Sequence, residues 1–388
     1  MSDMRVQWLR WALAAIALLV LAATVQADTA GATQGTREQT LVAVVGYVAD
    51  EREIQVMGHT RLIQELELVV RSGERSGEVL QVEHHRETYA GQVPYQECDL
   101  VYVTETVIEG EAPAYFVVGY VRWPRLAFLA LGLIVIVVLV ARQRGALALV
   151  GMAFSFLVIF VLVLPRLAAG EEPVSSALLG AALTLPISYY LAHGLNRKTT
   201  VALLGSLVGL ALTGVMAVVA VDVAQLSGYA SEEVGLLRTL GTDVTDVRGL
   251  LLAGLIVSML GVLDDITVAQ SAVVEQLYHA NPELSWRQLY VRAMHVGQDH
   301  IASMVNTLVL VYAGAALPFL LLMSDQAVSP LYALSLEPVA EEIVRMLATS
   351  AGLVATVPIT TLLAALALRV WRGSERAGAE MLQADADE

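Results

Sequence analysis

Long apolar segments follow one another through the last two thirds of the chain, separated by short polar stretches. They lie at residues 126–140, 146–164, 174–192, 201–221, 249–274, 301–323 and 347–370. A helix needs about 20 mostly apolar residues to cross the hydrocarbon core of a bilayer. The pattern therefore predicts a polytopic α-helical membrane protein, with a seven-helix transmembrane domain over residues 123–372 and an acidic tail over residues 373–388.

A different pattern occupies residues 28–122, where short apolar or alternating runs are separated by turns rich in Gly, Glu and Ser. The runs lie at residues 41–49, 52–59, 66–73, 78–85, 99–106 and 114–121. Alternation with a period of two is typical of strands that bury one face. We expect a small all-β domain, either a barrel or a sandwich. Its single cysteine, Cys98, allows no internal disulfide.

The first residues have the features of an export signal. Arg5 and Arg10 precede an apolar core, and residues 25–27 (VQA) resemble the small-residue site at which signal peptides are cleaved. Residues 1–27 are therefore either a cleaved signal peptide or a retained signal anchor. Both alternatives export the β-domain that follows, which makes that domain extracytoplasmic.

Composition and charge agree with a membrane protein. Hydrophobic residues make up 56% of the 388 residues, charged residues only 16%, and the mean hydropathy is +0.64, values too apolar for an ordinary soluble domain. With the β-domain outside, nine basic residues fall in cytoplasmic loops and four in outer loops, as the positive-inside rule requires. This orientation leaves the C-terminus in the cytoplasm. The net charge of −15 offers no basic surface for nucleic acid.

Two adjacent acids, Asp264 and Asp265, interrupt the uncharged segment 249–274. They lie about 22 Å along the helix from its start, at or past the middle of a bilayer. A charge there costs at least about 2.5 to 3.5 kcal/mol, and protonation, an interior cavity or a bound cation would relieve that cost. The alternative is that the helix enters the bilayer late, near Leu255, and that the acids mark a cytoplasmic boundary, which Thr267 makes more polar.

The segment between the acids and the next span predicts a short cytoplasmic helix. Residues 281–282 (Asn-Pro) end the preceding helix, and Ser285 with Gln288 fits a capping box. Apolar residues then recur at helical spacing, so we expect this helix to lie on the membrane surface. Titratable residues cluster at its end: His295, Asp299 and His300. They are either solvated boundary residues or the mouth of a proton or ion pathway.

The last span contains prolines at two informative positions. Pro338 lies at a helix start with Glu341 and Glu342 in the first turns, where acids favourably face the helix dipole. Pro358 lies within the span among threonines and should kink the helix, which frees backbone carbonyls. A kink of this kind either serves helix packing or lines a substrate or ion site.

Several chemistries find no support in the sequence. Metal-ligating residue types occur at His84, His85, Glu97, Cys98 and Asp99, but their spacing is not that of a zinc finger. The chain contains no P-loop, GxSxG or HExxH motif. An intramembrane aspartyl protease would need a second deep acid on a facing helix. We therefore expect no enzyme activity, no cofactor and no metal.

Three strings carry a family resemblance: HGLNRKTTVALLG at residues 193–205, GQDHIASMVNTLVLVYAGAALPFLLL at residues 297–322 and AEEIVRMLATSAGLVATVPITTLLAAL at residues 340–366. Together with the exported β-domain before them, they resemble the YibE/F family of bacterial multi-spanning membrane proteins. The resemblance covers nearly the whole chain and is specific in its last half. It implies a multi-pass protein of the bacterial cytoplasmic (inner) membrane and specifies no chemistry.

Residues around the acid pair also resemble part of the resistance-nodulation-division (RND) transporters and their SecD/SecF relatives. In these proteins a glycine precedes an acid-bearing helix, a short amphipathic link follows, and the next helix opens with small and hydroxyl residues. The resemblance implies that Asp264 and Asp265 relay protons. RND relays commonly include a membrane-embedded base, whereas the only lysine here, Lys198, lies beside Arg197 at a cytoplasmic loop. A relay in this chain would use neutral partners or a second protomer.

Two classes of function remain. The first is a transporter or transport-system subunit coupled to a proton or cation. Its candidate coupling residues are Asp264, Asp265, Thr267, Ser303, Asn306 and Thr307, with His295, Asp299, His300 and Pro358 as secondary candidates. The second is a non-transporting assembly or sensing protein whose outer β-domain binds an envelope partner. The expected partners are the lipid bilayer and either a second copy of the chain or an envelope protein.

Overall fold

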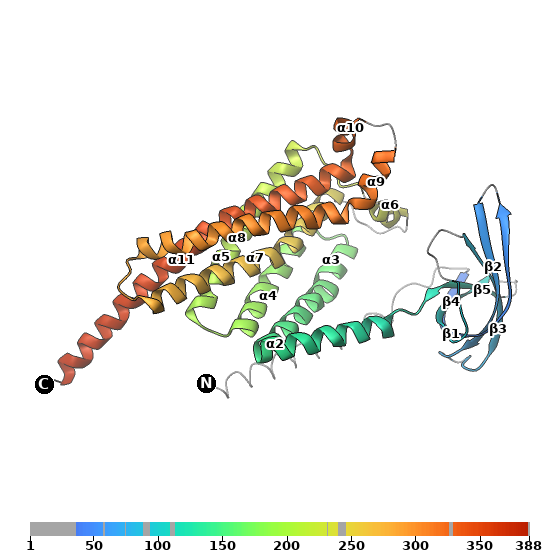
Figure 1. Ribbon diagram of the computed structural model, residues 1–388, viewed down its shortest axis with the longest axis horizontal. Helices are drawn as coiled ribbons and strands as arrows, with labels where there is room; N and C mark the ends of the chain where they lie inside the picture. The colour runs from blue at the N-terminus through green and yellow to red at the C-terminus, as the bar shows by residue number, and fades with distance from the viewer. Residues whose placement is uncertain are drawn as a thin grey trace. The chain divides into compact units, whose positions relative to one another are not determined.

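The computed structural model describes residues 36–56, 59–73, 75–87, 94–108, 113–230, 232–239, 246–325 and 329–386. The predicted signal peptide or anchor, residues 1–27, lies outside them. The described residues form two compact units, with the boundary at residues 139–140. The first unit contains the β-sheet, and the second contains most of the helices (Figure 1).

The first unit is built on a five-stranded antiparallel sheet with the strand order β3-β2-β1-β4-β5 (Figure 1). Its strands are β1 (Thr36–Val56), β2 (His59–Val70), β3 (Val79–Glu87), β4 (Leu100–Ile108) and β5 (Ala114–Tyr120). The first two predicted runs, 41–49 and 52–59, are not separate strands, because β1 continues through both for 21 residues. Register shifts at Val45/Tyr47 and Val48/Asp50 interrupt its pairing with β2; such bulges bend a strand without ending it.

Alternation along the strands buries one face of the sheet. Leu41 and Val45 of β1, for example, are 2% and 0% exposed. The edge strands β3 and β5 approach each other, and between them the Tyr95 ring lies 5.1 Å from the His84 ring and 4.7 Å from the Tyr120 ring. Among the residues described, the β-domain is therefore a half-barrel made of one sheet and not a sandwich of two.

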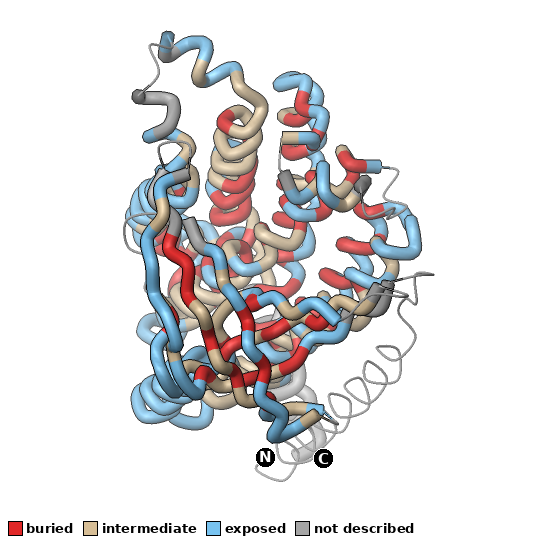
Figure 2. The backbone as a smooth tube through the Cα atoms, turned by 90° about the vertical axis from the view of Figure 1, so that its right-hand side faces the viewer, coloured by how far each residue is buried: buried red, intermediate tan, exposed pale blue. Residues whose placement is uncertain are grey.

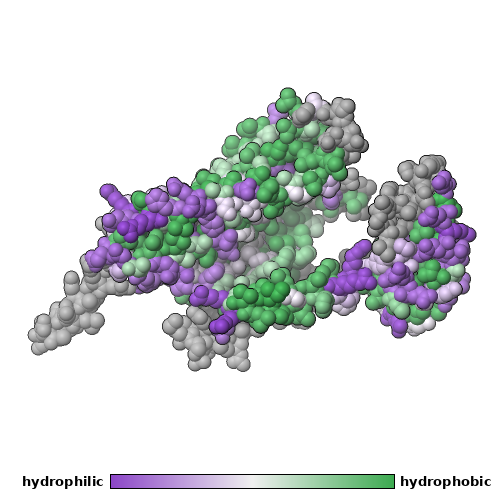
Figure 3. Space-filling view, viewed as in Figure 1, coloured by the Kyte–Doolittle hydropathy of each residue, from purple (hydrophilic) through white to green (hydrophobic). Residues whose placement is uncertain are grey.

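The second unit is a bundle of helices (Figure 1). The helical elements of the chain are α2 (Trp123–Val158), the π-helix η1 (Ile159–Val163), α3 (Leu164–Ala168), α4 (Pro173–His193), α5 (Arg197–Val223), α6 (Glu232–Thr239), α7 (Val247–Ala280), α8 (Trp286–Ala315), α9 (Leu317–Asp325), α10 (Pro330–Ser335) and α11 (Glu337–Ala386). Their described surface is largely hydrophobic, most clearly along the first half of α2 (Figure 3).

Within the described residues, five helical stretches are long and apolar enough to cross a membrane. They are Trp123–Ala168, Pro173–His193, Arg197–Val223, Val247–Ala280 and Glu337–Leu368. The predicted spans 126–140 and 146–164 both fall in the first of these, which has 46 residues. At Arg142, between the two, φ is 52° and ψ is −135°, so the helix is interrupted there without a loop.

The segment after α7 differs from the prediction. Asn281 does cap the end of α7, and Ser285 with Gln288 does form the predicted capping box. However, the predicted surface helix and the predicted span 301–323 are not separate, because α8 runs without a break from Trp286 to Ala315. Gly297 does not end the helix. A Cβ atom there would lie 2.8 Å from Val357 of α11, so this glycine allows α8 and α11 to pack closely.

The last helix begins at Glu337, as the position of Pro338 predicts, and continues to Ala386. The predicted acidic tail, residues 373–388, is therefore helical as far as it is described. Pro358 lies inside α11 and does not end it. Helix α11 packs against α5, α7 and α8, which makes it a central element of the bundle.

Helices α5 and α11 pack against each other through glycines and threonines in a regular antiparallel register. A Cβ atom added to any of three glycines would collide with a threonine of the other helix: Gly205 with Thr360, Gly209 with Thr356, and Gly352 with Thr213. Each step of four residues forward on α5 matches four residues back on α11. We call this contact the glycine–threonine zipper. Small residues at such positions let helix backbones approach closely.

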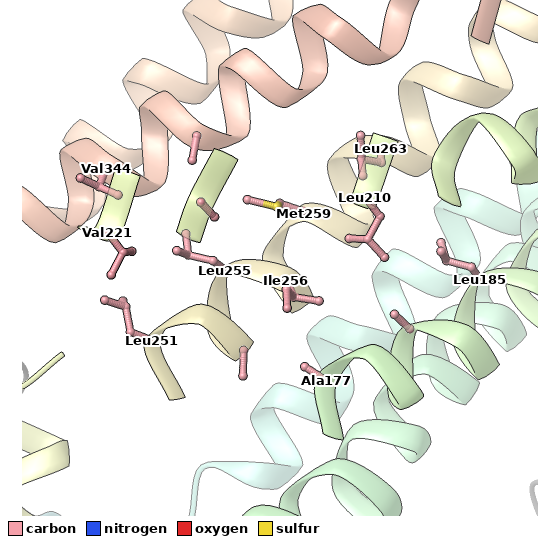
Figure 4. Close-up of a cluster of buried hydrophobic side chains, with 14 of the residues drawn as sticks. Ala177, Leu185, Leu210, Val221, Leu251, Leu255, Ile256, Met259, Leu263 and Val344 are labelled. Carbon is pink, nitrogen blue, oxygen red and sulfur yellow. The ribbon is translucent and has the colours of Figure 1, made fainter. Parts of the chain in front are cut away.

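The same register continues into the hydrophobic core. Four residues further along each helix, Ala217 falls opposite Ala348, and one step later Val221 falls opposite Val344; all four are buried. Figure 4 shows Val221 beside Val344, and next to them Leu255 and other apolar residues of α7. Buried positions therefore run along the length of the bundle helices (Figure 2). The core holds α5, α7 and α11 in one packed arrangement.

Candidate functional site

Helix α7 carries both acids, but it places them in different surroundings. Its start is fixed by Asp246, whose side chain accepts a hydrogen bond from the backbone N–H of Gly249 at 2.8 Å. Asp264 is half-buried, whereas Asp265 is exposed. Successive residues of a helix point about 100° apart, so only Asp264 turns toward the bundle. The two acids are therefore not an equivalent pair.

The Asp264 carboxyl group is incompletely satisfied. Its Oδ1 atom is shielded from solvent and has no hydrogen-bond partner among the residues that the structure describes. Between Arg248 and Glu275, the only other charged residue of α7 is Asp265. A buried polar atom without a hydrogen-bond partner lowers the free energy of unfolding. Buried polar groups without partners call for an explanation beyond packing, and this makes Asp264 the centre of the candidate site.

Asp264 lines a cavity of about 350 Å³ among α2, η1, α4 and α7. The lining residues are Ala148, Met152, Ser155, Phe156, Ile159, Ser188, Ala192, His193 and Asp264. Most of this lining is apolar, with two hydroxyl groups and two titratable side chains. The first residue of the π-helix, Ile159, contributes to the wall, and short π-helical turns are frequent at functional sites.

A cluster of three hydroxyl groups lies beside the acid, where α4, α5 and α7 meet. The Tyr189 hydroxyl is hydrogen-bonded to Ser206 Oγ and, at 2.8 Å, to Thr267 Oγ1. Ser206 Oγ and Thr267 Oγ1 are also 2.8 Å apart. All three side chains are at most 1% exposed. Tyr189 interacts electrostatically with the Asp264 carboxyl group, so this hydroxyl cluster is part of the surroundings of the acid.

Gln270 extends the polar interior of α7 by about one turn beyond Thr267. Its Nε2 atom donates a hydrogen bond to the backbone carbonyl of Ala293 in α8 at 2.9 Å, and the side chain is 1% exposed. Because this bond crosses from one helix to the other, it fixes the position of α8 on α7. The next residue, Ser271, is buried, and its hydroxyl has no partner among the described residues.

The other predicted coupling residues do not join Asp264. Ser303, Asn306 and Thr307 lie on α8 and are exposed, and none of them lines the cavity. The Thr307 hydroxyl donates to the backbone carbonyl of Ser303 at 2.9 Å, a bond within its own helix. Of the predicted neutral partners, only Thr267 takes part in the hydroxyl cluster.

The secondary candidates are also outside the cavity. His295 and Asp299 are exposed, and His300 is half-buried on α8. Pro358 is half-buried in α11 and does not line the cavity. Within the described residues, no three His, Cys, Asp or Glu side chains are grouped as metal ligands. The site is therefore built from α2, α4, α5 and α7.

Five polar residues of the site were not predicted from the sequence: Ser155, Ser188, Tyr189, His193 and Ser206. Tyr189 follows Pro186 in an uncharged segment, and Ser206 lies between Gly205 and Gly209. A tyrosine or serine hydroxyl inside a membrane-length span needs a hydrogen-bond partner. This requirement is the one signal in the sequence that marks Tyr189 and Ser206 as candidates. It does not reveal which helix supplies the partner.

Other charged residues of the bundle form pairs near its two ends. At one end Lys198 Nζ lies 3.3 Å from Glu275 Oε2. At the other, Arg248 pairs with Asp222, and Glu337 accepts hydrogen bonds from Ser227 Oγ at 2.7 Å and Gly228 N at 3.0 Å. Asp264 lies between these two sets along α7.

A protein-family model described as YibE/F-like protein matches residues 129–370 of the chain. Comparisons with curated proteins and with solved structures returned no match. The matched region contains every residue of the cavity lining and of the hydroxyl cluster.

Proposed function

The chain belongs to the YibE/F-like family, and from that premise we propose that it is a transporter or a transport-system subunit coupled to a proton or cation through Asp264. The single observation that carries the proposal is the buried Oδ1 atom of Asp264, which has no hydrogen-bond partner among the described residues and lies at a cavity. Acids inside apolar spans are expensive and commonly serve ion or proton pathways. Asp265, which is exposed, has a minor role in this proposal.

The setting of the proposal is the bacterial inner membrane. The five membrane-length helices and the excess of basic residues in one set of loops support a multi-pass arrangement. In this arrangement the β-domain lies outside, and the C-terminal end of α11 lies in the cytoplasm. The local resemblance to RND transporters supports the same role for the acid-bearing helix.

A second candidate function rests on the outer face of the sheet. Tyr47, Phe116 and Val118 point away from the core and are 55%, 58% and 67% exposed. Phe116 and Val118 alternate along the edge strand β5 and so lie on the same face of it, and exposed apolar residues on one face can mark a binding surface. This observation favours the alternative in which the β-domain binds an envelope partner and the helices anchor it.

Carbodiimide labelling across pH tests the main proposal. The reagent attacks protonated carboxyl groups in apolar surroundings, so Asp264 should be labelled in the lipid-embedded protein and labelling should fall as pH rises. Peptide mapping identifies the labelled residue. Asp264→Asn should remove the label, whereas the matched variant Asp265→Asn should keep it.

The same experiment can decide against the proposal. Absence of label on Asp264 at every neutral or mildly acidic pH would mean that the carboxyl group is solvated or ion-paired. Equal labelling of both acids would mean that the burial of Asp264 does not distinguish it. Either result would move the envelope-partner alternative ahead.

A further inference from the structure

The cavity beside Asp264 has hydroxyl groups along its wall and a histidine among its lining. Ser155 and Ser188 contribute hydroxyls, and His193 ends α4 and is exposed. The volume of about 350 Å³ has room for several water molecules, each of which occupies about 30 Å³ in the liquid. Water in such a cavity would connect Asp264 with the surface on which His193 lies.

The opposite side of Asp264 is closed. Tyr189, Ser206 and Thr267 are hydrogen-bonded to one another, and Thr267 also donates to the backbone carbonyl of Leu263 at 2.8 Å. Beyond them lies the apolar core of the bundle. Met259, Leu263 and Leu210 belong to this core (Figure 4), and Met259 is 0% exposed. The cavity lining includes no residue of this core.

The surface near His193 carries positive charge. Lys198 and Arg144 act on His193 electrostatically, and the charge of Lys198 is partly offset by Glu275, whose Oε2 atom lies 3.3 Å away. A positive rim raises the energy of a metal cation that approaches the cavity. It is a smaller obstacle to a proton, which passes along hydrogen-bonded water and hydroxyl groups without a hydrated ion entering.

We propose that the coupling ion is a proton and that it reaches Asp264 from one side only, through water in this cavity at the His193 end of α4. The proposal deepens the proposed function, and it rests on Asp264 being the coupling residue. The hydroxyl cluster and the apolar core behind it keep Asp264 separated from the other side in the conformation described. A second conformation, in which the access changes sides, would be needed for transport.

The charged and titratable groups around the pathway are few. Tyr189 and Asp265 act on Asp264, and Lys198 and Arg144 act on His193. The facing parts of α5 and α11, residues 199–221 and 346–368, contain no charged residue. On α8 the charged and titratable residues near this level are Arg292, His295, Asp299 and His300; the first three are exposed, and His300 is half-buried.

Cysteine accessibility tests the water-filled entry directly, because Cys98 is the only native cysteine and Cys98→Ser supplies a background without thiols. Single cysteines at Ser188 and Ala192 probe the cavity, and Ser206→Cys probes the closed side. A charged, membrane-impermeant thiol reagent is applied to the full-length protein in sealed vesicles of both orientations. Thr200→Cys and Ala224→Cys, exposed near the two ends of α5, report which face the reagent reaches.

The expected result is that Ser188→Cys and Ala192→Cys react from the same face as Thr200→Cys, and that Ser206→Cys does not react. Leu204→Cys, whose parent side chain is 50% exposed on α5, is the control for a lipid-facing position and should also stay unlabelled. Reaction of the cavity cysteines from the Ala224 face, or no reaction from either face, would overturn the proposal.

The identity of the ion is tested by carbodiimide labelling in the same vesicles, with pH set independently on the two sides. A change of pH on the Thr200 side should change the labelling of Asp264 at least tenfold more than the same change of pH on the Ala224 side. Sodium, lithium or potassium ions at constant pH should give no protection. Protection by one of these cations, or dependence on the other side, would contradict a proton taken up through this cavity.

The two experiments separate this inference from the proposed function. If Asp264 is not labelled at all, the proposed function fails, and the cysteine pattern still reports whether water enters the cavity. If Asp264 is labelled and the cavity cysteines do not react, the result supports Asp264 as the coupling residue and contradicts proton entry through this cavity.

Discussion

Two contacts of helix α5 lie side by side and differ in how they satisfy their polar groups. On one face, the glycine–threonine zipper joins α5 to α11, and the hydroxyls of Thr213 and Thr356 donate to carbonyls of their own helices at 2.6 and 2.7 Å. On another face, Ser206 bonds to hydroxyls of α4 and α7. The third zipper threonine, Thr360, has a buried hydroxyl with no partner among the described residues, so none of the three hydroxyls bonds to another helix, whereas the second contact depends on the positions of α4 and α7. Packing and site chemistry are therefore carried by different faces of one helix.

This difference indicates which part of the bundle is able to change. A contact made of small residues, with no hydroxyl bonded to a further helix, does not depend on where α4 and α7 lie, so we expect α5 and α11 to stay together as a pair. The bonds among Tyr189, Ser206 and Thr267 join three helices, and a shift of α4 or α7 would break them. We therefore expect motion at the cavity to leave the zipper in place.

The largest effect is expected at the zipper. A Cβ atom at Gly209 would lie 2.5 Å from Thr356 Oγ1 and 2.8 Å from Thr356 Cγ2, so Gly209→Ala should lower the free energy of unfolding by about 1 to 3 kcal/mol. The matched control is Gly214→Ala on the same helix, where a Cβ atom would meet nothing within 4 Å. That variant should be neutral or stabilising by up to about 1 kcal/mol. Thermal unfolding in detergent, followed by circular dichroism, compares them.

Equal stability of the Gly209→Ala and Gly214→Ala variants would contradict this prediction. If Gly209→Ala were as stable as Gly214→Ala, the zipper would have to be loose enough to accept a methyl group. The close approach of α5 to α11 would then not set the architecture of the bundle.

A smaller effect is expected at the hydroxyl cluster. Tyr189→Phe removes the hydroxyl that bonds to both Ser206 and Thr267 but leaves those two bonded to each other, so it should cost about 1 kcal/mol. Tyr190→Phe is the matched control, because the Tyr190 hydroxyl bonds only to the exposed Thr200, at 3.1 Å, among the contacts seen for it. Its cost should be below about 0.5 kcal/mol. The same unfolding measurement, with carbodiimide labelling of Asp264 in parallel, tests both variants.

The labelling readout makes this prediction specific. If Tyr189→Phe lowers stability without changing the pH profile of Asp264 labelling, the hydroxyl cluster is structural only. A changed profile with Tyr189→Phe, and an unchanged one with Tyr190→Phe, would show that the cluster acts on the acid.

The smallest effect is expected on the exposed face of α8. Asn306→Ala should change the free energy of unfolding by less than about 0.5 kcal/mol, because the Asn306 side chain is exposed in the described part of α8. Asp264 labelling should also be unchanged. If Asn306→Ala instead lowers the apparent mass of the detergent-solubilised protein, a second copy covers this face, and the neutral-partner prediction regains support through that copy.

Much of the fold could be predicted from local sequence. The capping box at Ser285 and Gln288 and the stop at Asn281 follow from short-range chemistry. Asp264 stands out because a charge interrupts an apolar run. The continuity of β1 was missed, since the residues between its two halves read as a turn, and bulges carry the strand through them.

The partners of Asp264 could not be predicted in the same way. Which of two adjacent acids faces the bundle depends on how α7 is rotated against its neighbours, and this is set by packing over many residues. The prediction of Ser303, Asn306 and Thr307 rests on the expectation that the next helix in sequence faces the acid. The structure places α4 beside α7 at this level, and its residues Ser188 and Tyr189 are therefore the neighbours of the site.

The four-residue register of the zipper also limits how α11 can slide along α5. Each glycine accepts one threonine, and a displacement by a single residue would set Thr356 against a neighbour of Gly209 that carries a side chain. A displacement by a whole repeat of four residues, about 6 Å along the axis, restores only one glycine–threonine pair. In one direction Gly209 would face Gly352, and in the other Thr213 would face Thr356. The zipper therefore specifies a single axial position of α11 on α5.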